Sequence, residues 1–228
     1  MNGARLRGVI FDMDGVLVDS HAVHREAWSI FFRSLGREVP DSELDFVLDG
    51  RKRREILLHF LGECAGPELE ALGRRKDRIF RQMQVAVNPV PGVVRMTREL
   101  HAGGAALAVA TSGSRDRARF TLKELGLQDC FQVVVTGEDV RLGKPDAAIY
   151  RLACSHLGLE AACLLAVEDA ISGIRAAVGA GLQCVGVALH EKPEKLAAAG
   201  AVPVVPHFEG IGAQDLENML MAKGADDS

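Results

Sequence analysis

The sequence predicts an α/β fold, a doubly wound parallel sheet with an inserted helical cap domain. Short apolar runs that indicate buried strands are each followed by polar residues, at 9–11, 105–110, 131–135 and 164–167. From Val93 onward such runs alternate with helical segments, as in a parallel sheet covered by helices. Between about residue 20 and residue 89 the pattern is helical without a convincing strand, which indicates an insertion after the first strand.

The first predicted strand ends in a pair of carboxylates. The run Val9–Phe11 leads into Asp12 and Asp14, and Gly15 lets the backbone turn sharply directly after them. Two negative charges so close repel each other, so the pair favours a divalent cation, a shared proton, or a division between nucleophile and acid/base. On its own the Asp-x-Asp pattern also fits a solvated strand end.

Three helices are expected in the insertion, because apolar residues recur there at intervals of three to four. They are Trp28, Phe31, Phe32 and Leu35, then Ile56, Leu57, Phe60 and Leu61, then Leu69, Leu72, Lys76, Ile79, Phe80 and Met83, the third set including one lysine. The segment Asn88–Gly92 contains two prolines and indicates a hinge or linker. The predicted boundaries are 1–19 and 90–228 for a Rossmann-like core and 20–89 for the helical cap.

Three more polar clusters follow the later strands. The run 105–110 ends in Thr111–Ser114 before a helix, 131–135 is followed by Gly143–Asp146, and 164–167 ends in Glu168 and Asp169. In an open parallel sheet, ligands bind outside the carboxyl ends of the strands. We therefore expect these clusters to converge with the first carboxylate pair on one crevice.

That crevice would suit a phosphate and a metal ion. Hydroxyl and N–H groups of Thr111 and Ser112 at a helix start favour a phosphate, and Lys144 supplies a point charge for it. Pro145 is expected in the first turn of the following helix. Four carboxylates offer the hard oxygen ligands that suit Mg²⁺ rather than zinc: Asp12, Asp14, Glu168 and Asp169. The set predicts metal-assisted phosphoryl transfer with a carboxylate nucleophile.

In order and type, these motifs resemble those of the haloacid dehalogenase superfamily phosphohydrolases, in the branch that includes β-phosphoglucomutase and phosphoglycolate phosphatase. The resemblance covers nearly the whole chain and rests on Asp12–Val16, Thr111, Lys144–Pro145, and Glu168–Asp169 with Gly173. It implies that Asp12 forms an aspartyl-phosphate. It implies that Asp14 protonates the leaving oxygen, later activates water, and gives its backbone carbonyl to Mg²⁺.

The same resemblance implies roles for the other motif residues. Thr111 and Lys144 would hold the phosphoryl oxygens, and Asp169 would complete the metal site with Glu168 close by. The second aspartate, Asp14, argues against true dehalogenation, because the dehalogenating relatives lack it.

In the cap, three residues match positions that β-phosphoglucomutase-like enzymes use. They are His24 near the acid/base aspartate, Arg53 in a substrate loop, where it would meet a second anionic group of the ligand, and Lys76. Without the resemblance, His24 reads as an exposed helix histidine, Arg53 as part of a solvated basic run, and Lys76 as one of several exposed basic residues. At Gly113 the chain departs from the mutases, which carry side chains there that touch the sugar.

Composition excludes several classes of partner. The formal net charge is −4, from 27 basic and 31 acidic residues, which predicts no binding to nucleic acid or an anionic membrane. No apolar stretch approaches the ~20 residues of a membrane helix, and the start of the chain reads as a strand rather than a signal peptide. The five cysteines form no Cys-x-x-Cys motif and read as reduced thiols of a cytoplasmic protein. We expect a monomer or a weak dimer.

The sequence leads to one preferred function. We expect a Mg²⁺-dependent phosphatase that acts on a small phosphorylated metabolite such as a sugar phosphate. A phosphosugar mutase like β-phosphoglucomutase is the alternative. A phospho-acceptor signalling module also uses clustered aspartates, a Thr or Ser and a lysine, but the length of this chain and the acid/base partner Asp14 argue against it.

Overall fold

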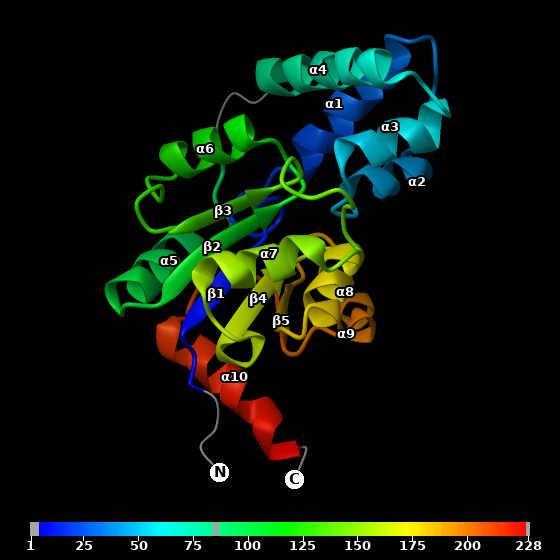
Figure 1. The fold of residues 1–228 in the computed structure, drawn as a ribbon. Helices are drawn as coiled ribbons and strands as arrows, with labels where there is room; N and C mark the ends of the chain where they lie inside the picture. The colour runs from blue at the N-terminus through cyan, green and yellow to red at the C-terminus, as the bar shows by residue number, and fades with distance from the viewer. Residues whose placement is uncertain (1–4, 84–86, 227–228) are drawn as a thin grey trace.

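A parallel sheet lies at the centre of the computed structural model, which describes residues 5–83 and 87–226 (Figure 1). Its strand order is β3-β2-β1-β4-β5-β6, and every neighbouring pair is parallel. The strands are β1 (Gly8–Phe11), β2 (Ala106–Thr111), β3 (Val133–Thr136), β4 (Leu164–Glu168), β5 (Gln183–Val187) and β6 (Val204–Val205). The first strand in the sequence is therefore central, between β2 and β4.

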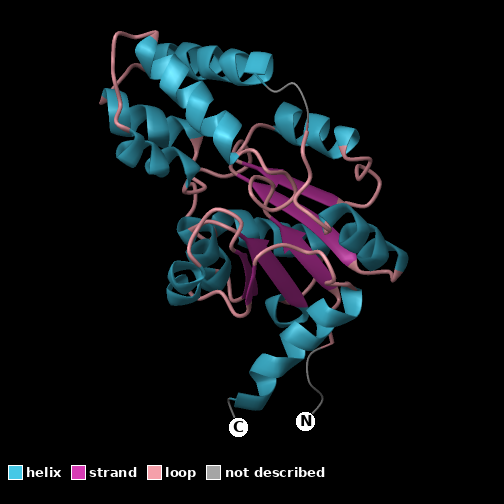
Figure 2. Ribbon diagram, turned by 180° about the vertical axis from the view of Figure 1, so that it is seen from behind, coloured by secondary structure: helices cyan, strands magenta, loops and turns pink. Residues whose placement is uncertain are grey.

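Helices cover both faces of this sheet (Figure 2). One face packs against α5 (Val93–Ala102), α6 (Arg115–Glu124) and α10 (Ala213–Asp226). The other face packs against α7 (Ala148–Leu157), α8 (Ile171–Gly179) and α9 (Pro193–Ala199), and the short helix η2 (Ala161–Cys163) precedes β4. This doubly wound arrangement confirms the predicted fold class.

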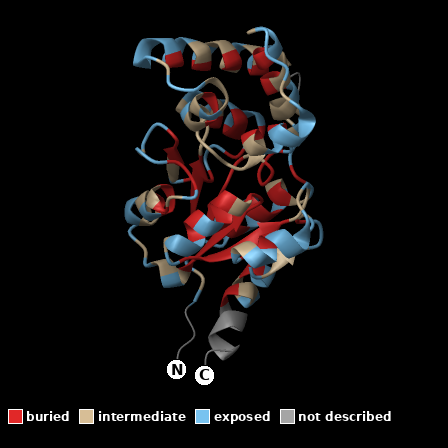
Figure 3. Ribbon diagram, turned by 90° about the vertical axis from the view of Figure 1, so that its right-hand side faces the viewer, coloured by how far each residue is buried: buried red, intermediate tan, exposed pale blue. Residues whose placement is uncertain are grey.

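The apolar strand runs follow from burial on both faces. Val9 and Phe11 contribute to one hydrophobic cluster, whereas Ile10 between them contributes to the other. All three side chains are fully buried, so no polar residue is tolerated along the strand before Asp12. Figure 3 shows the strands as a buried layer between helices whose outer faces are exposed.

A second, helical layer lies above the carboxyl ends of the strands (Figure 1). It consists of α1 (His21–Arg33), α2 (Asp41–Leu44), η1 (Asp45–Leu48), α3 (Arg53–Leu61) and α4 (Gly66–Met83). The three long helices confirm the predicted periodicity, whereas α2 and η1 had not been predicted.

This helical layer has a hydrophobic core of its own. Trp28 stacks on Phe32 with ring centroids 5.4 Å apart, and Leu44, Ile56 and Leu69 pack beside them. The chain enters and leaves it through two paired segments, where the Asp19 N–H donates to the Asn88 carbonyl over 2.8 Å. The boundaries at residues 20 and 89 stay a prediction that these contacts support.

Among the described residues, no helix is long and apolar enough to cross a membrane. All five cysteines are free thiols.

Candidate active site

The crevice forms where β1, β2 and β4 end side by side. Phe11 is paired with Val109 on one side and Val167 on the other. Asp12 therefore follows β1 between the ends of the two neighbouring strands, where Thr111 and Glu168 lie, and its N–H donates to the Val167 carbonyl over 2.9 Å. The parallel order of the strands brings these predicted residues together.

Lys144 is buried between two of the carboxylates. Its Nζ lies 2.6 Å from Oδ1 of Asp12 and 2.5 Å from Oε1 of Glu168, and it also donates to the Ala110 carbonyl over 3.1 Å. The lysine is 1 % exposed. Its pKa is raised, since the two carboxylates outweigh the effect of burial, so it stays charged at any physiological pH.

Glu168 is held by a full set of donors. Beside Lys144, the hydroxyl of Tyr150 donates to Oε1 over 2.8 Å, and the backbone N–H groups of Asp169 and Ala170 donate to Oε2 over 3.0 and 3.2 Å. The carboxylate fills the space where a Cβ of Gly173 would be, which explains the glycine at this point of α8. Glu168 is thus fixed in one orientation.

Three carboxylates could hold a cation. Asp12, Glu168 and Asp169 are buried, and each offers an oxygen within 4.8 Å of the others. Burial, together with the charges of the neighbouring carboxylates, raises the pKa of Asp12 well above its ordinary value although Lys144 opposes this. Three carboxylates facing one ammonium leave two negative charges, which a divalent cation would balance, and oxygen-only donors suit Mg²⁺. The residues therefore fit the expected metal.

The side chain of Asp14 lies in a different environment. It receives hydrogen bonds on Oδ1 from the hydroxyl of Ser20 and from the guanidinium of Arg117, and Nε2 of His24 lies 3.4 Å away. Burial alone would raise the pKa of Asp14, but the charge of Arg117 lowers it well below the ordinary value. The acidic group of three does not include this side chain, so its expected metal contact through the backbone carbonyl stays a prediction.

His24 and Lys76 reach this side of the crevice from the cap. His24 stacks on Phe80, and its Nε2 lies 3.0 Å from a guanidinium nitrogen of Arg117 while its Nδ1 lies 3.1 Å from Nζ of Lys76. Lys76 is 5 % exposed and has two aromatic rings within 5.0 Å, those of Trp28 and Phe80. Lys76 is buried and the His24 side chain is only 12 % exposed, which contradicts their alternative interpretation as exposed helix positions.

The environment of His24 and Lys76 lowers the pKa of both side chains. Burial, then the charges of Lys76 and Arg117, lower the pKa of His24 to about 3, so the ring is neutral at pH 7. Arg117 is always charged and can only donate, so Nε2 accepts and the ring proton lies on Nδ1. That N–H can donate to Lys76 only when the lysine is in its amine form, and burial and the charge of Arg117 bring this form within reach of neutral pH by lowering the Lys76 pKa to about 7.

The remaining predicted residues lie as follows. Thr111 is buried, and its Oγ1 accepts from the Gly113 N–H over 3.1 Å. The hydroxyl of Ser112 donates to the Gly50 carbonyl of the cap over 2.5 Å. Arg53 pairs with Asp77 and, at 3.7 Å, with Glu70, both on α4 rather than in the crevice. Their expected contacts with phosphate or substrate stay predictions.

The prediction for Pro145 was wrong. It lies in a turn before α7, and the helix begins only at Ala148. The reason is local: the Asp146 N–H donates to the Gly143 carbonyl over 3.0 Å, and the Asp146 carboxylate accepts the Ala148 N–H over 2.8 Å. Lys144 is therefore placed by a turn and by its own ion pairs.

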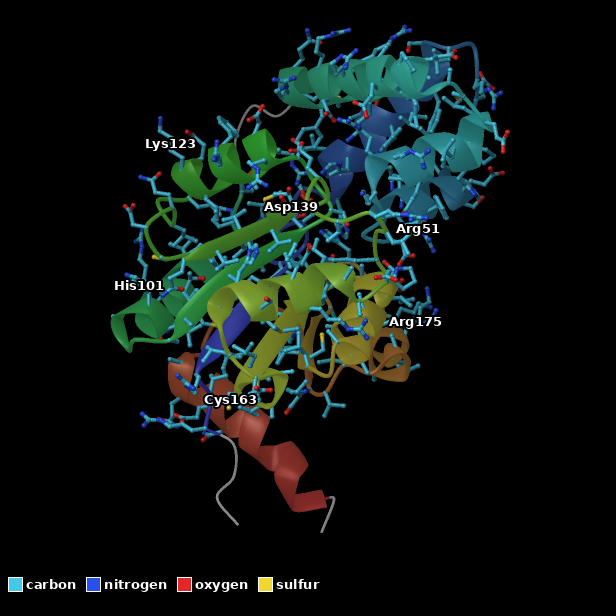
Figure 4. All side chains as sticks on the ribbon, in the orientation of Figure 1. Arg51, His101, Lys123, Asp139, Cys163 and Arg175 are labelled. Atoms are coloured by element: carbon cyan, nitrogen blue, oxygen red, sulfur yellow. The ribbon has the colours of Figure 1, made fainter. Side chains whose placement is uncertain are left out.

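The cap also contacts the core beside Lys144. Oε1 of Glu55 accepts the Gly143 N–H over 3.0 Å, and Nζ of Lys52 donates to the Val140 carbonyl over 2.7 Å. The Ser172 N–H donates to Oδ1 of Asp49 over 3.0 Å. Arg51 lies at this contact between the cap helices and the core (Figure 4). The cap is thus hydrogen-bonded to both sides of the crevice.

Three site residues were missed by sequence reasoning. Arg117 carried a usable signal, because a basic residue in the first turn of a helix opposes the helix dipole and so indicates another role. Tyr150 and His21, whose Nε2 lies 2.9 Å from Oδ2 of Asp169, gave no such signal, because their contacts depend on tertiary structure.

The chain is similar to known proteins in sequence and in fold. The sequence model of the haloacid dehalogenase-like hydrolases matches residues 6–181. Validoxylamine A 7'-phosphate phosphatase of Streptomyces hygroscopicus is 36% identical over 83% of this chain and 89% of its own length. β-Phosphoglucomutase of Bacillus subtilis is 31% identical over 80% of this chain and 83% of its own length. The crystal structure of CbbY from Rhodobacter sphaeroides in complex with xylulose-1,5-bisphosphate superimposes with a TM-score of 0.82 at 28% identity, over 92% and 99% of the two chains.

Proposed function

The chain belongs to the haloacid dehalogenase-like hydrolase family, and we propose that it is a Mg²⁺-dependent phosphatase that hydrolyses a small phosphorylated sugar through an aspartyl-phosphate. The observation that carries this proposal is the buried group of Asp12, Glu168 and Asp169 around Lys144, with Asp14 two residues from Asp12. The sugar is inferred from the relatives, one of which is a phosphosugar mutase and another of which binds a sugar bisphosphate. A cytoplasmic location is part of the proposal and is supported by the free thiols.

In the first half of the reaction, an oxygen of Asp12 attacks phosphorus and the bond to the sugar oxygen breaks. Asp14 gives its proton to that leaving oxygen. Lys144 and the hydroxyl and N–H groups of Thr111 and Ser112 hold the phosphoryl oxygens. In the second half, water attacks phosphorus, Asp14 takes a proton from it, and inorganic phosphate leaves with Asp12 restored. Mg²⁺, held by Asp12, Glu168, Asp169 and the Asp14 carbonyl, would supply positive charge that lets a carboxylate approach a phosphate dianion.

The cap would select the substrate. His24 and Lys76 lie on the Asp14 side of the crevice together with Arg117, whose Nε has no hydrogen-bond partner among the described residues. We assign polar contacts with the sugar to these groups. Arg53 can meet a second anionic group only after it leaves Asp77.

A mutase remains the second candidate, favoured by the relative from Bacillus subtilis and by the match of the three cap residues. A mutase must bind a bisphosphate at its distal end and keep water from the aspartyl-phosphate. The pairing of Arg53 with Asp77 reduces the contacts available for a distal phosphate, and the bare backbone at Gly113 offers no side chain to touch the sugar. These two observations favour the phosphatase.

The proposal is tested by a screen of phosphorylated sugars and acids, with inorganic phosphate and sugar isomers measured in the same samples. We expect phosphate release with little isomerisation, and none of either for Asp12→Asn. Asp14→Asn is the matched variant: it should lose far more activity on sugar phosphates, whose leaving alkoxide needs a proton, than on p-nitrophenyl phosphate. Conversion of β-glucose 1-phosphate to glucose 6-phosphate without phosphate release would establish the mutase instead.

A further inference from the structure

The first turn of the cap's first helix contacts the acidic group of the core. His21, the first residue of α1, lies with Nε2 2.9 Å from Oδ2 of Asp169. The His21 side chain is half-buried, at 14 % exposure, and the Asp169 side chain is buried, at 6 %. This contact joins a residue without a role in the proposed reaction to a proposed metal ligand.

The turn after Asp12 is shaped for this contact. Gly15 has φ +74°, and a Cβ there would lie 2.9 Å from Nε2 of His21 and would overlap with the carboxylate of Asp169. Because Gly15 has no side chain, the His21 imidazole and the Asp169 carboxylate can meet beside its Cα. A side chain at this position would push one away from the other.

A second histidine supports the ring of the first. His190, in the loop after β5, stacks on His21 with ring centroids 4.7 Å apart and an interplanar angle of 28°. Its own Nε2 lies 2.7 Å from Oδ1 of Asp19. The His190–Asp19 pair is about 40 % exposed, at 38 % and 41 %, and does not touch Asp169. The stack restricts the orientation of the His21 ring, and hence the direction of its Nε2.

We propose that His21 is a positioning residue that holds the Asp169 carboxylate in the orientation needed to bind a divalent cation. This inference rests on the proposed function, because it requires the metal site of Asp12, Glu168 and Asp169. His21 itself is not among the groups whose ligand atoms cluster within 4.8 Å, as far as the described residues show, and Mg²⁺ prefers oxygen to imidazole. Partners that orient a metal-binding carboxylate typically contribute about 10–100-fold to metal affinity.

The test measures Mg²⁺ binding directly, by isothermal titration calorimetry on the full chain after treatment with EDTA. His21→Phe keeps an aromatic ring for the stack but has no N–H, and we expect its Kd for Mg²⁺ to rise about tenfold or more. His21→Gln keeps an amide donor and should stay within about threefold of the wild type. His190→Phe is the matched control, because it preserves the stack and removes only the exposed contact with Asp19, and it should leave the Kd unchanged.

The outcomes separate the two proposals. If the wild type binds Mg²⁺ and His21→Phe binds it equally well, the role of His21 is refuted while the proposed function stands. An equal loss in His190→Phe would also refute it, because the effect would then come from the packing of α1. If the wild type binds no Mg²⁺, both proposals fail. Circular dichroism verifies folding, and if His21→Phe does not fold, His21→Leu against His21→Gln makes the same comparison.

Discussion

Lys76 gives the sharpest test of the electrostatics of the cap. This lysine is 5 % exposed, faces His24 and two aromatic rings, and has its pKa lowered from 10.5 to about 7, first by burial and then by the charge of Arg117. In the unfolded chain the same group has its ordinary pKa. Because a tenfold change in a proton-binding constant is worth about 1.4 kcal/mol, the buried ammonium destabilises the protein by about 5 kcal/mol at pH 7 and below.

The dependence on pH has a definite sign. Between the folded pKa of about 7 and the unfolded pKa of 10.5, the unfolded chain holds a proton that the folded chain does not, so stability rises with pH by about 1.4 kcal/mol for each pH unit. Lys76→Met has no such proton. It should therefore be more stable than the wild type at pH 7, and its advantage should shrink by about 2 kcal/mol between pH 7 and pH 8.5.

Urea unfolding of both proteins at several pH values measures this difference. Trp28, the single tryptophan of the chain, lies 5.0 Å from Nζ of Lys76 and reports on the cap by its fluorescence. Lys123→Met is the control, because this lysine is exposed on α6, away from the cap (Figure 4). A constant difference between Lys76→Met and the wild type over this pH range would refute the reasoning.

Four further predictions test the site itself. EDTA should silence hydrolysis and Mg²⁺ restore it, and Asp169→Ala should raise the half-saturating Mg²⁺ concentration by about tenfold or more; full activity in EDTA would contradict this. Tyr150→Phe removes a donor to Glu168 and should lower the free energy of unfolding by about 1.5–3 kcal/mol in urea titrations, whereas an unchanged midpoint would argue against the bond. Gly15→Ala strains a positive φ and should destabilise the protein by about 1–3 kcal/mol in the same assay. Arg53→Ala should reduce kcat/KM for bisphosphates more than for p-nitrophenyl phosphate, and an equal loss would place Arg53 outside the substrate site.

The core of the site could be predicted because, in a parallel sheet, residues that directly follow the strands in the sequence lie together at one edge of the sheet. Asp12, Thr111 and Glu168 each follow an apolar strand, and strands that run in the same direction bring their ends to one edge. Even the burial of Lys76 was contained in the pattern, since it occupies an apolar position of the α4 periodicity. Local sequence patterns were sufficient to predict a position wherever it depends only on the strand or helix that carries the residue.

The other contacts depend on where elements pack, which no local pattern contains. Arg117 reaches Asp14 across the crevice from a different strand–helix unit. Arg53 forms an ion pair with Asp77 on a neighbouring helix. This pairing competes with the expected contact between Arg53 and a second anionic group of the ligand. The prediction for Pro145 was wrong for the opposite reason, because a local interaction decided the position. The hydrogen bond from the Ala148 N–H to the Asp146 carboxylate outweighed the preference of proline for the first helical turn.

The charges around Asp12 and Asp14 predict that the proposed reaction requires both a divalent cation and the substrate. In the free protein, burial and the charges of three carboxylates raise the pKa of Asp12 against the opposing charge of Lys144, whereas Arg117 lowers that of Asp14, although a nucleophile should be ionised and an acid protonated. A divalent cation among the carboxylates would ionise Asp12, and an anionic or polar substrate group that draws Arg117 away would let Asp14 take up a proton. The cation thus gives Asp12, and the substrate gives Asp14, the protonation state that the reaction requires. We therefore expect efficient phosphoryl transfer only when metal and substrate are bound together.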